Sequence, residues 1–406
     1  MEGTLHLMRT LLSLVLLATS AASQGAKSFA RVDPFTKSDP EIIAKAGYAS
    51  FGPFRLGDDH TTDQVEKALE GVPLIWVETA HFKLGSGLPE YTLPSDDQEK
   101  RRIQAELERL GKKLPDVKAK PKKLDPWLRL HLMAQRLEDT YTEFLAQFGL
   151  KETDFPSGPL EAKAESAAGP YMGTGRFLGM PAKYTVLVFD KKQHLERYTA
   201  IYFGQKAEAP LHKHLTGVGA LFYGTAAEFL TGEYDNDTAL TCALVWGVTQ
   251  DLAAGFRGAE TTLPFVWSEG LGHWFARRTD PRFHFFSGAD PAKNRITDEW
   301  NWALGVRARV ERKVFPSTEA MLAWNETDAL EWADHLVLWS RVDFLMSRED
   351  GAAGKLLRRL KEPAAEGAEE SGLARSQAAL LAAVNLAPAQ FDEAWSEWVL
   401  KTYPVK

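Results

Sequence analysis

The feature that most constrains this chain is an apolar stretch at residues 238–278, which predicts two consecutive helices. The first half of the stretch is apolar and carries Gln250 and Asp251. The second half begins after Pro264, and its run FVWSEGLGHWFARR carries Glu269. Any functional interpretation of the chain depends on the polar side chains that these two helices carry.

The segments around this stretch predict an α+β fold. Residues 72–84 are rich in β-branched and aromatic side chains, which is typical of one or two strands, and residues 184–190 and 217–223 predict further strands. Helices are predicted at 96–112, 126–149, 191–198, 298–313, 319–324, 328–346, 354–360, 374–384 and from Pro388 onward. The succession of helices after residue 298 predicts a helical C-terminal region.

Shifts in composition divide the chain into four regions. They are a signal peptide at 1–23, an N-terminal α/β region at 24–165, a core at 166–315 and a helical region at 316–406. Residues 24 to about 70 mix proline, glycine and short apolar pieces, and they predict an irregular lead-in. Segment 152–173, rich in Gly, Ala, Ser and Pro, marks a boundary or exposed loop, and the acidic segment 364–371 predicts another loop.

The N-terminus predicts export. Arg9 precedes an apolar run at 11–18, and small residues follow at 19–23, which is the pattern of a secretory signal peptide. The run is shorter than the roughly 20 apolar residues that span a bilayer, although a membrane anchor is the alternative interpretation. No other stretch is apolar for long enough to span a membrane. We therefore expect a periplasmic or extracellular protein without a membrane span after cleavage.

Charge and cysteine content narrow the partners and the chemistry. The formal net charge of -7 gives no basis for binding nucleic acid, which requires a basic face. Cys242 is the only cysteine, so the chain forms no internal disulfide. Because Cys242 lies in an apolar run, we expect a buried, unreactive thiol.

The second predicted helix carries a recognisable motif. The sequence Trp-Ser-Glu-Gly-Leu-Gly-His-Trp-Phe at 267–275 resembles the second motif, W-x-E-G-x-x-x-x-[FY], of the gluzincin branch of metallopeptidases, the thermolysin-like or peptidase MA-like clan. In that motif the glutamate is the third zinc ligand, and Glu269 occupies its position. The resemblance implies a zincin-like core of a small mixed sheet and active-site helices, and it extends more loosely over residues 73–406.

The first motif of the clan, H-E-x-x-H, is degenerate here. Its counterpart is QDLAA at 250–254, where Gln250 replaces the first histidine, Asp251 the catalytic glutamate and Ala254 the second histidine. Ala254 offers no donor atom, and the neutral amide of Gln250 is a poor zinc ligand beside imidazole. Asp251 keeps a carboxylate that is one methylene shorter. With Glu269 as the only strong ligand, the three-ligand arrangement of a catalytic zinc is lost.

We therefore expect an exported, gluzincin-like pseudopeptidase that has no catalytic activity and no cofactor. Its expected partner is a peptide or an envelope polymer held in the inherited cleft. The alternative hypothesis is an active peptidase that binds zinc through atypical ligands around Glu269. His273 follows Glu269 by four residues, so both side chains share one helix face and are the first candidates for such ligands.

Other interpretations of these residues remain open. His212 and His214, at i and i+2, share one side of an extended segment and could complete a metal site with Glu269 and His273. Ser268 matches a nucleophile elbow only in part, because Val266 stands where that motif has glycine. Asp251 and Glu269 could act as an acid pair without metal, or both could be hydrogen-bonded structural groups. His81 lies in a predicted strand, and a structural role is expected for it.

Overall fold

A computed structural model describes residues 29–157, 171–286, 301–324, 330–363 and 372–405. The predicted signal peptide and the acidic segment 364–371 lie outside these residues. Within them, the fold is α+β, with one five-stranded mixed sheet and a helical C-terminal region, as the sequence predicts. In the described part of the chain, no helix combines the length and apolar character that crossing a membrane requires.

The central sheet has the strand order β1-β2-β5-β7-β6. Its strands are β1 (Ile75–Glu78), β2 (Phe82–Ser86), β5 (Tyr184–Phe189), β6 (Leu211–Leu215) and β7 (Ala220–Ala226). The three central strands β2, β5 and β7 are parallel, whereas β1 and β6 are antiparallel edge strands. The predicted strand pair at 72–84 and the strand at 184–190 are confirmed, and β7 begins three residues later than predicted. The sequence did not predict β6 as a separate strand.

Side chains alternate between the two faces of this sheet, because successive strand residues point in opposite directions. On one face, Val186, Val188 and Tyr223 join the large core beneath α4 (Pro126–Gln147) and α7 (Asp237–Gly255). On the other face, Leu187, Phe189 and Phe222 pack with residues of α2 (Thr62–Ala68) and α6 (Lys192–Phe203). Helices thus cover both faces of the sheet, and β5 is buried along its full length.

The N-terminal lead-in is more regular than the sequence predicts. It contains α2 and a further helix, α1 (Pro40–Ala46), each with a well-formed start. The Asp39 carboxylate accepts hydrogen bonds from the first-turn amides of α1, and Thr61 and Gln64 form a capping box at α2. The prediction of an irregular segment is wrong here, because local caps define helices too short to show an apolar repeat.

The remaining described elements complete the two ends of the molecule. Near the N-terminal end lie the small sheet β3 (Tyr91–Thr92) with β4 (Lys123–Leu124) and helix α3 (Asp97–Gly111). Short 3-10 turns occur at Glu152–Asp154, Ala227–Phe229 and Gly232–Tyr234. The C-terminal region consists of α9 (Trp302–Arg312), α10 (Thr318–Leu322), α11 (Trp332–Ser347), α12 (Ala352–Leu360), α13 (Gly372–Val384) and α14 (Pro388–Thr402).

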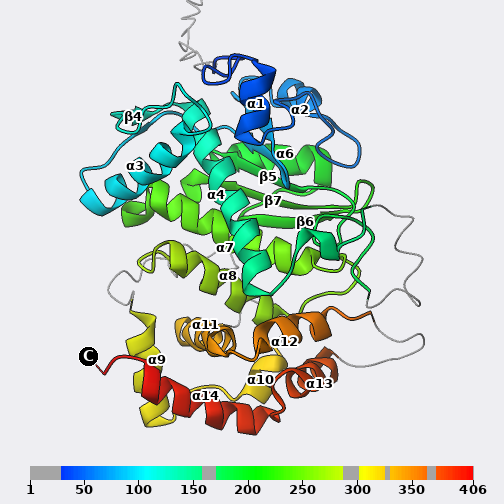
Figure 1. The fold of residues 1–406 in the computed structure, drawn as a ribbon, viewed down its shortest axis with the longest axis vertical. Coiled ribbons are helices and arrows are strands. Elements are labelled where there is room, and N and C mark those ends of the chain that lie inside the picture. The colour runs from blue at the N-terminus through cyan, green and yellow to red at the C-terminus, as the bar shows by residue number, and fades with distance from the viewer. Residues whose placement is uncertain (1–28, 158–170, 287–300, 325–329, 364–371, 406) are drawn as a thin grey trace, which may run out of the picture.

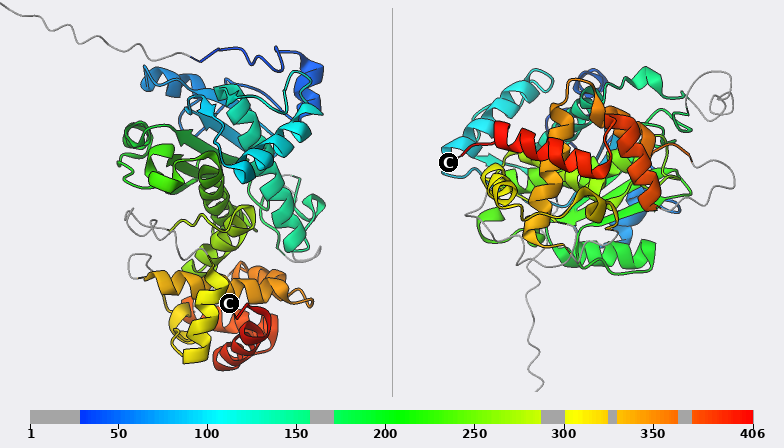
Figure 2. Two further views of the ribbon diagram at one scale, coloured as in Figure 1. Left: turned by 90° about the vertical axis from the view of Figure 1, so that its left-hand side faces the viewer. Right: turned by 90° about the horizontal axis from the view of Figure 1, so that it is seen from below.

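Helix α8 (Phe265–Thr279) lies between the sheet layer and the C-terminal helices. Figures 1 and 2 show α9 to α14 gathered at one end of the molecule, with α7 and α8 between them and the sheet. Helix α8 packs against α7 on one side and against α11 on the other. The apolar stretch 238–278 therefore joins the two halves of the fold, and most of the side chains of α7 and α8 are buried because both halves cover them.

Candidate metal centre

Local residues mark the starts of helices α7 and α8. The Asn236 side chain accepts a hydrogen bond from the Ala239 amide at the start of α7, and Pro264 directly precedes α8. The helices approach closely at Gly272, where a β-carbon would lie 2.8 Å from Cδ1 of Trp246. On the same side of α8, the Ser268 hydroxyl contacts Oε1 of Gln250 at 3.4 Å. These contacts define the face of α8 that meets α7.

Glu269 and His273 point from a different face of α8 and meet α11. Glu269 Oε1 lies 3.3 Å from His273 Nε2 and 3.4 Å from His335 Nδ1. His273 Nε2 and His335 Nδ1 are 3.0 Å apart. Among the described residues, this is the group of carboxylate and imidazole side chains whose ligand atoms lie close enough together to hold a metal ion. The two ligands from α8 share one face because they are four residues apart.

The three side chains are enclosed by protein. Glu269 is 0% exposed, His273 1% and His335 2%. Aromatic rings surround the imidazoles: Phe286 lies 4.2 Å from His335 and Trp302 5.0 Å from His273 between ring centroids. A site of this kind is dry, so charges within it interact more strongly than they would in water.

Burial and the close contacts shift the pKa values of Glu269 and His273. Burial raises the pKa of Glu269, but hydrogen bonding and charge interaction with His273 and His335 outweigh it and hold the pKa below its ordinary range. Burial is the largest influence on His273 and lowers its pKa to about 4, although Glu269 opposes the shift. An ionised carboxylate and a neutral imidazole are the forms in which these side chains bind metals.

The residues that resemble the first motif have partners of their own. Asp251 Oδ1 pairs with His212 Nδ1 at 2.7 Å, so α7 is joined to the edge strand β6 at this point. The carbonyl of Ala254 accepts a hydrogen bond from Lys361 Nζ at 2.6 Å. The side chain of Gln250 contacts the hydroxyl of Ser268. The structure thus brings Glu269 and His273 together, and it places His212 with Asp251.

The other candidate residues predicted from the sequence have packing or hydrogen-bonding partners that indicate structural roles. His81 stacks on Tyr141 with ring centroids 3.7 Å apart, and its Nδ1 lies 2.6 Å from Glu138 Oε2. Cys242 is buried, and burial raises the pKa of its thiol to about 12, so the thiolate is scarce at neutral pH. Ser268 lies within α8. Each has packing or hydrogen-bonding partners that account for its presence.

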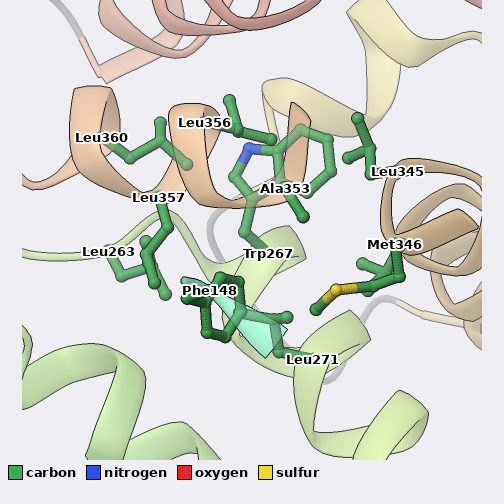
Figure 3. Close-up of a pocket in the computed structure, with 11 residues that line it drawn as sticks. Phe148, Leu263, Trp267, Leu271, Leu345, Met346, Ala353, Leu356, Leu357 and Leu360 are labelled. Carbon is green, nitrogen blue, oxygen red and sulfur yellow. The ribbon is translucent and has the colours of Figure 1, made fainter. Parts of the chain in front are cut away.

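Trp267 belongs to a separate, apolar face of α8. Figure 3 shows it beside a small pocket between α8, α11 and α12, together with Leu271, Leu345 and Leu356. Eleven side chains line this pocket, and all of them are apolar or aromatic. The tryptophan of the W-x-E-G motif therefore packs α8 against the C-terminal helices, while Glu269 points to a different part of the same interface.

His335 is the member of the group that sequence reasoning missed. It lies 62 residues after His273, inside an apolar helix that the sequence predicts without assigning any role to the histidine. A lone histidine in such a helix carries no spacing signal that links it to α8. No protein-family model, curated protein or solved structure matches this chain. The gluzincin resemblance accordingly depends on the motifs of the chain itself.

Proposed function

We propose that this chain is an exported, gluzincin-like protein without peptidase activity that binds an extended peptide or a peptide-bearing envelope polymer. The observation that supports this most strongly is the pairing of Asp251 with His212 at 2.7 Å. Asp251 occupies the position of the clan's general base, and here its carboxylate is held by the edge strand. A base has to reach the proton it removes, and this carboxylate is committed to another partner.

The zinc that the resemblance implies does not fit the residues of α7. Catalytic zinc requires three protein ligands and an open position for water. Ala254 has no side-chain donor, its carbonyl is occupied by Lys361, and the neutral amide of Gln250 accepts a hydrogen bond from the Ser268 hydroxyl. No step of hydrolysis can therefore be assigned to a metal between α7 and α8.

The edge strand β6 is the feature that favours binding of an extended chain. In the described sheet it pairs with β7 on one side, and no described strand lies on its other side. An unpaired strand edge offers main-chain donors and acceptors to an added peptide strand. Lys213 is exposed on β6, and its positive charge suits a peptide with acidic groups. The bound segment would lie beside the His212–Asp251 pair.

A second candidate, a peptidase that uses atypical ligands around Glu269, is favoured by the Glu269–His273–His335 group. The burial of that group argues against it. A catalytic metal must meet its substrate, and the three side chains are 0%, 1% and 2% exposed. A binding protein therefore agrees better with the surroundings of both Asp251 and Glu269.

Two measurements on the purified protein test the proposal. We expect no cleavage of a complex peptide mixture, followed by mass spectrometry, with or without added zinc. We expect an excess of acidic peptides or of peptidoglycan fragments to slow hydrogen exchange of the amides in β6, with β1 at the opposite edge unchanged. Cleavage that is lost in Asp251→Asn would refute the non-catalytic role. If hydrogen exchange in β6 is as fast with each peptide or polymer pool as without it, the proposed binding surface is refuted.

Export is tested separately. Expression of the full chain in a bacterial host should place the protein outside the cytoplasm, and N-terminal sequencing should find it shortened near residue 23. A matched chain that starts at residue 24 should stay in the cytoplasm. Retention of the full chain in the cytoplasm with an intact N-terminus would contradict the assignment.

A further inference from the structure

We propose that Glu269, His273 and His335 bind one divalent transition-metal ion, zinc by preference, in a structural site that joins α8 to α11. This site is distinct from the one that the gluzincin motifs imply, because two of its three ligands have no counterpart in those motifs. The inference is independent of the proposed peptide binding, since it rests on different residues and on a buried part of the molecule.

The geometry of the three ligand atoms suits zinc. Zinc bonds to imidazole nitrogen and carboxylate oxygen are about 2.0–2.1 Å long, so tetrahedral angles place neighbouring ligand atoms about 3.3 Å apart. The three observed separations are 3.3 Å, 3.4 Å and 3.0 Å. A triangle of this size suits one ion bound near its centre by all three side chains.

When Glu269 is ionised, which is the form that binds a metal, hydrogen bonds alone cannot satisfy all three contacts. The ionised Glu269 has no proton to donate, so only the two imidazole N–H groups can supply protons to the triangle. If both nitrogens donate to Glu269, the 3.0 Å contact between His273 and His335 joins two donors. If only one nitrogen carries a proton, one of the contacts joins two acceptors. A cation at the centre attracts all three lone pairs at once.

The donor set and its surroundings indicate the kind of ion and its role. Imidazole and carboxylate ligands suit zinc among the common cellular metals, whereas calcium and magnesium require mostly oxygen ligands. The aromatic rings of Phe286 and Trp302 close around the imidazoles. The ion would neutralise a carboxylate that burial otherwise makes costly. Because two ligands come from α8 and one from α11, it would fasten the C-terminal helices to the core.

Metal analysis and thermal unfolding test the proposal. Full-length protein, expressed with zinc and dialysed into metal-free buffer, should retain about one zinc per chain. Removal of zinc by a chelator should lower Tm, and added zinc should restore it. Cobalt added to the chelated protein should give the visible absorption of a tetrahedral site. These measurements need no variant, so they stand even if the substituted proteins fold poorly.

Substitutions then assign the ligands. His335→Gln and His273→Gln should each lower the zinc content at least about tenfold and abolish the zinc-dependent rise in Tm. The matched control is His284→Gln, because His284 is a buried histidine in the same aromatic surroundings but is bonded to Tyr234. It should retain zinc. The proposal would be overturned if the wild-type protein contained no zinc and its Tm did not change when zinc was added. It would also be overturned if His284→Gln alone lost zinc.

Discussion

Asp251 shows how a buried carboxylate can be held by a partner from a distant part of the chain. Its side chain is 5% exposed and belongs to α7, while its partner His212 belongs to the edge strand and is 32% exposed. The 2.7 Å contact between them bridges a helix and a strand that are 39 residues apart in sequence. A buried carboxylate needs such a partner, since an unpaired one would be costly to desolvate.

The role of the Asp251–His212 pair can be tested by two substitutions. Asp251→Ala removes the acceptor for the His212 N–H and should lower the free energy of unfolding by about 1–3 kcal/mol. Asp251→Asn retains an acceptor oxygen and should cost less than half as much. Urea unfolding monitored by tryptophan fluorescence measures both. If the alanine variant is as stable as the wild-type protein, the pair does not contribute to the free energy of unfolding.

At the scale of elements, α7 lies close against the sheet at Gly247. A β-carbon at this position would overlap with the ring of Tyr223, which is fully buried on β7 and whose hydroxyl donates a hydrogen bond to the carbonyl of Ala243. The absence of a side chain therefore sets how near the helix lies to the strand. The same distance determines where Asp251, one turn further along α7, meets β6.

Gly247→Ala should consequently destabilise the protein by about 1–3 kcal/mol, because overpacking outweighs the gain in helix propensity. The matched control is Gly372→Ala at the start of α13, where a β-carbon would meet open space. The control should be neutral or stabilise by up to about 1 kcal/mol. Thermal unfolding of the two variants side by side measures the difference, and equal Tm values would contradict the argument.

Elements with a strong local signal were predictable, and those imposed by a neighbour were not. Asp125 followed by Pro126 predicted the start of α4, and the Asp125 side chain does cap it. Strand β6 has the sequence LHKHL, without a β-branched residue, and it is extended because it pairs along its whole length with β7. Pairing of this kind depends on residues elsewhere in the chain, so the sequence of β6 alone does not predict it.

At the scale of the whole molecule, buried titratable groups make stability depend on pH. Burial lowers the pKa of His284 to about 3. Glu138 and Asp237 also have lowered pKa values: burial raises them, but His81 in one case and Arg136 with Arg102 in the other outweigh burial. For each group, the unfolded chain takes up its proton at a higher pH than the folded protein does.

The free energy of unfolding should therefore fall as the pH is lowered. Between pH 6.5 and about 3, the unfolded state protonates at His284 while the folded state stays neutral there. Below about pH 4.5, the lowered carboxyl pKa values add to the loss. Burial raises the pKa of Asp139 and Asp343, and these two groups oppose the trend.

His284→Gln provides the test, because it removes one of the responsible groups. In chelator-treated protein, this variant should lose about 1–3 kcal/mol less stability between pH 7 and pH 4 than the wild-type protein does. Urea unfolding at a series of pH values gives both slopes. Identical slopes would show that the pKa of His284 is the same in the folded and unfolded states.

Local sequence patterns were enough to predict the elements around the candidate site, including the α+β class, the two helices of 238–278 and the shared face of Glu269 and His273. These follow from local periods, caps and spacings that act over a few residues. The contacts of His335 with Glu269 and of His212 with Asp251 arise from the packing of distant elements. Contacts of this kind depend on how the buried faces of elements far apart in the chain pack together, and no local pattern in the sequence specifies that packing.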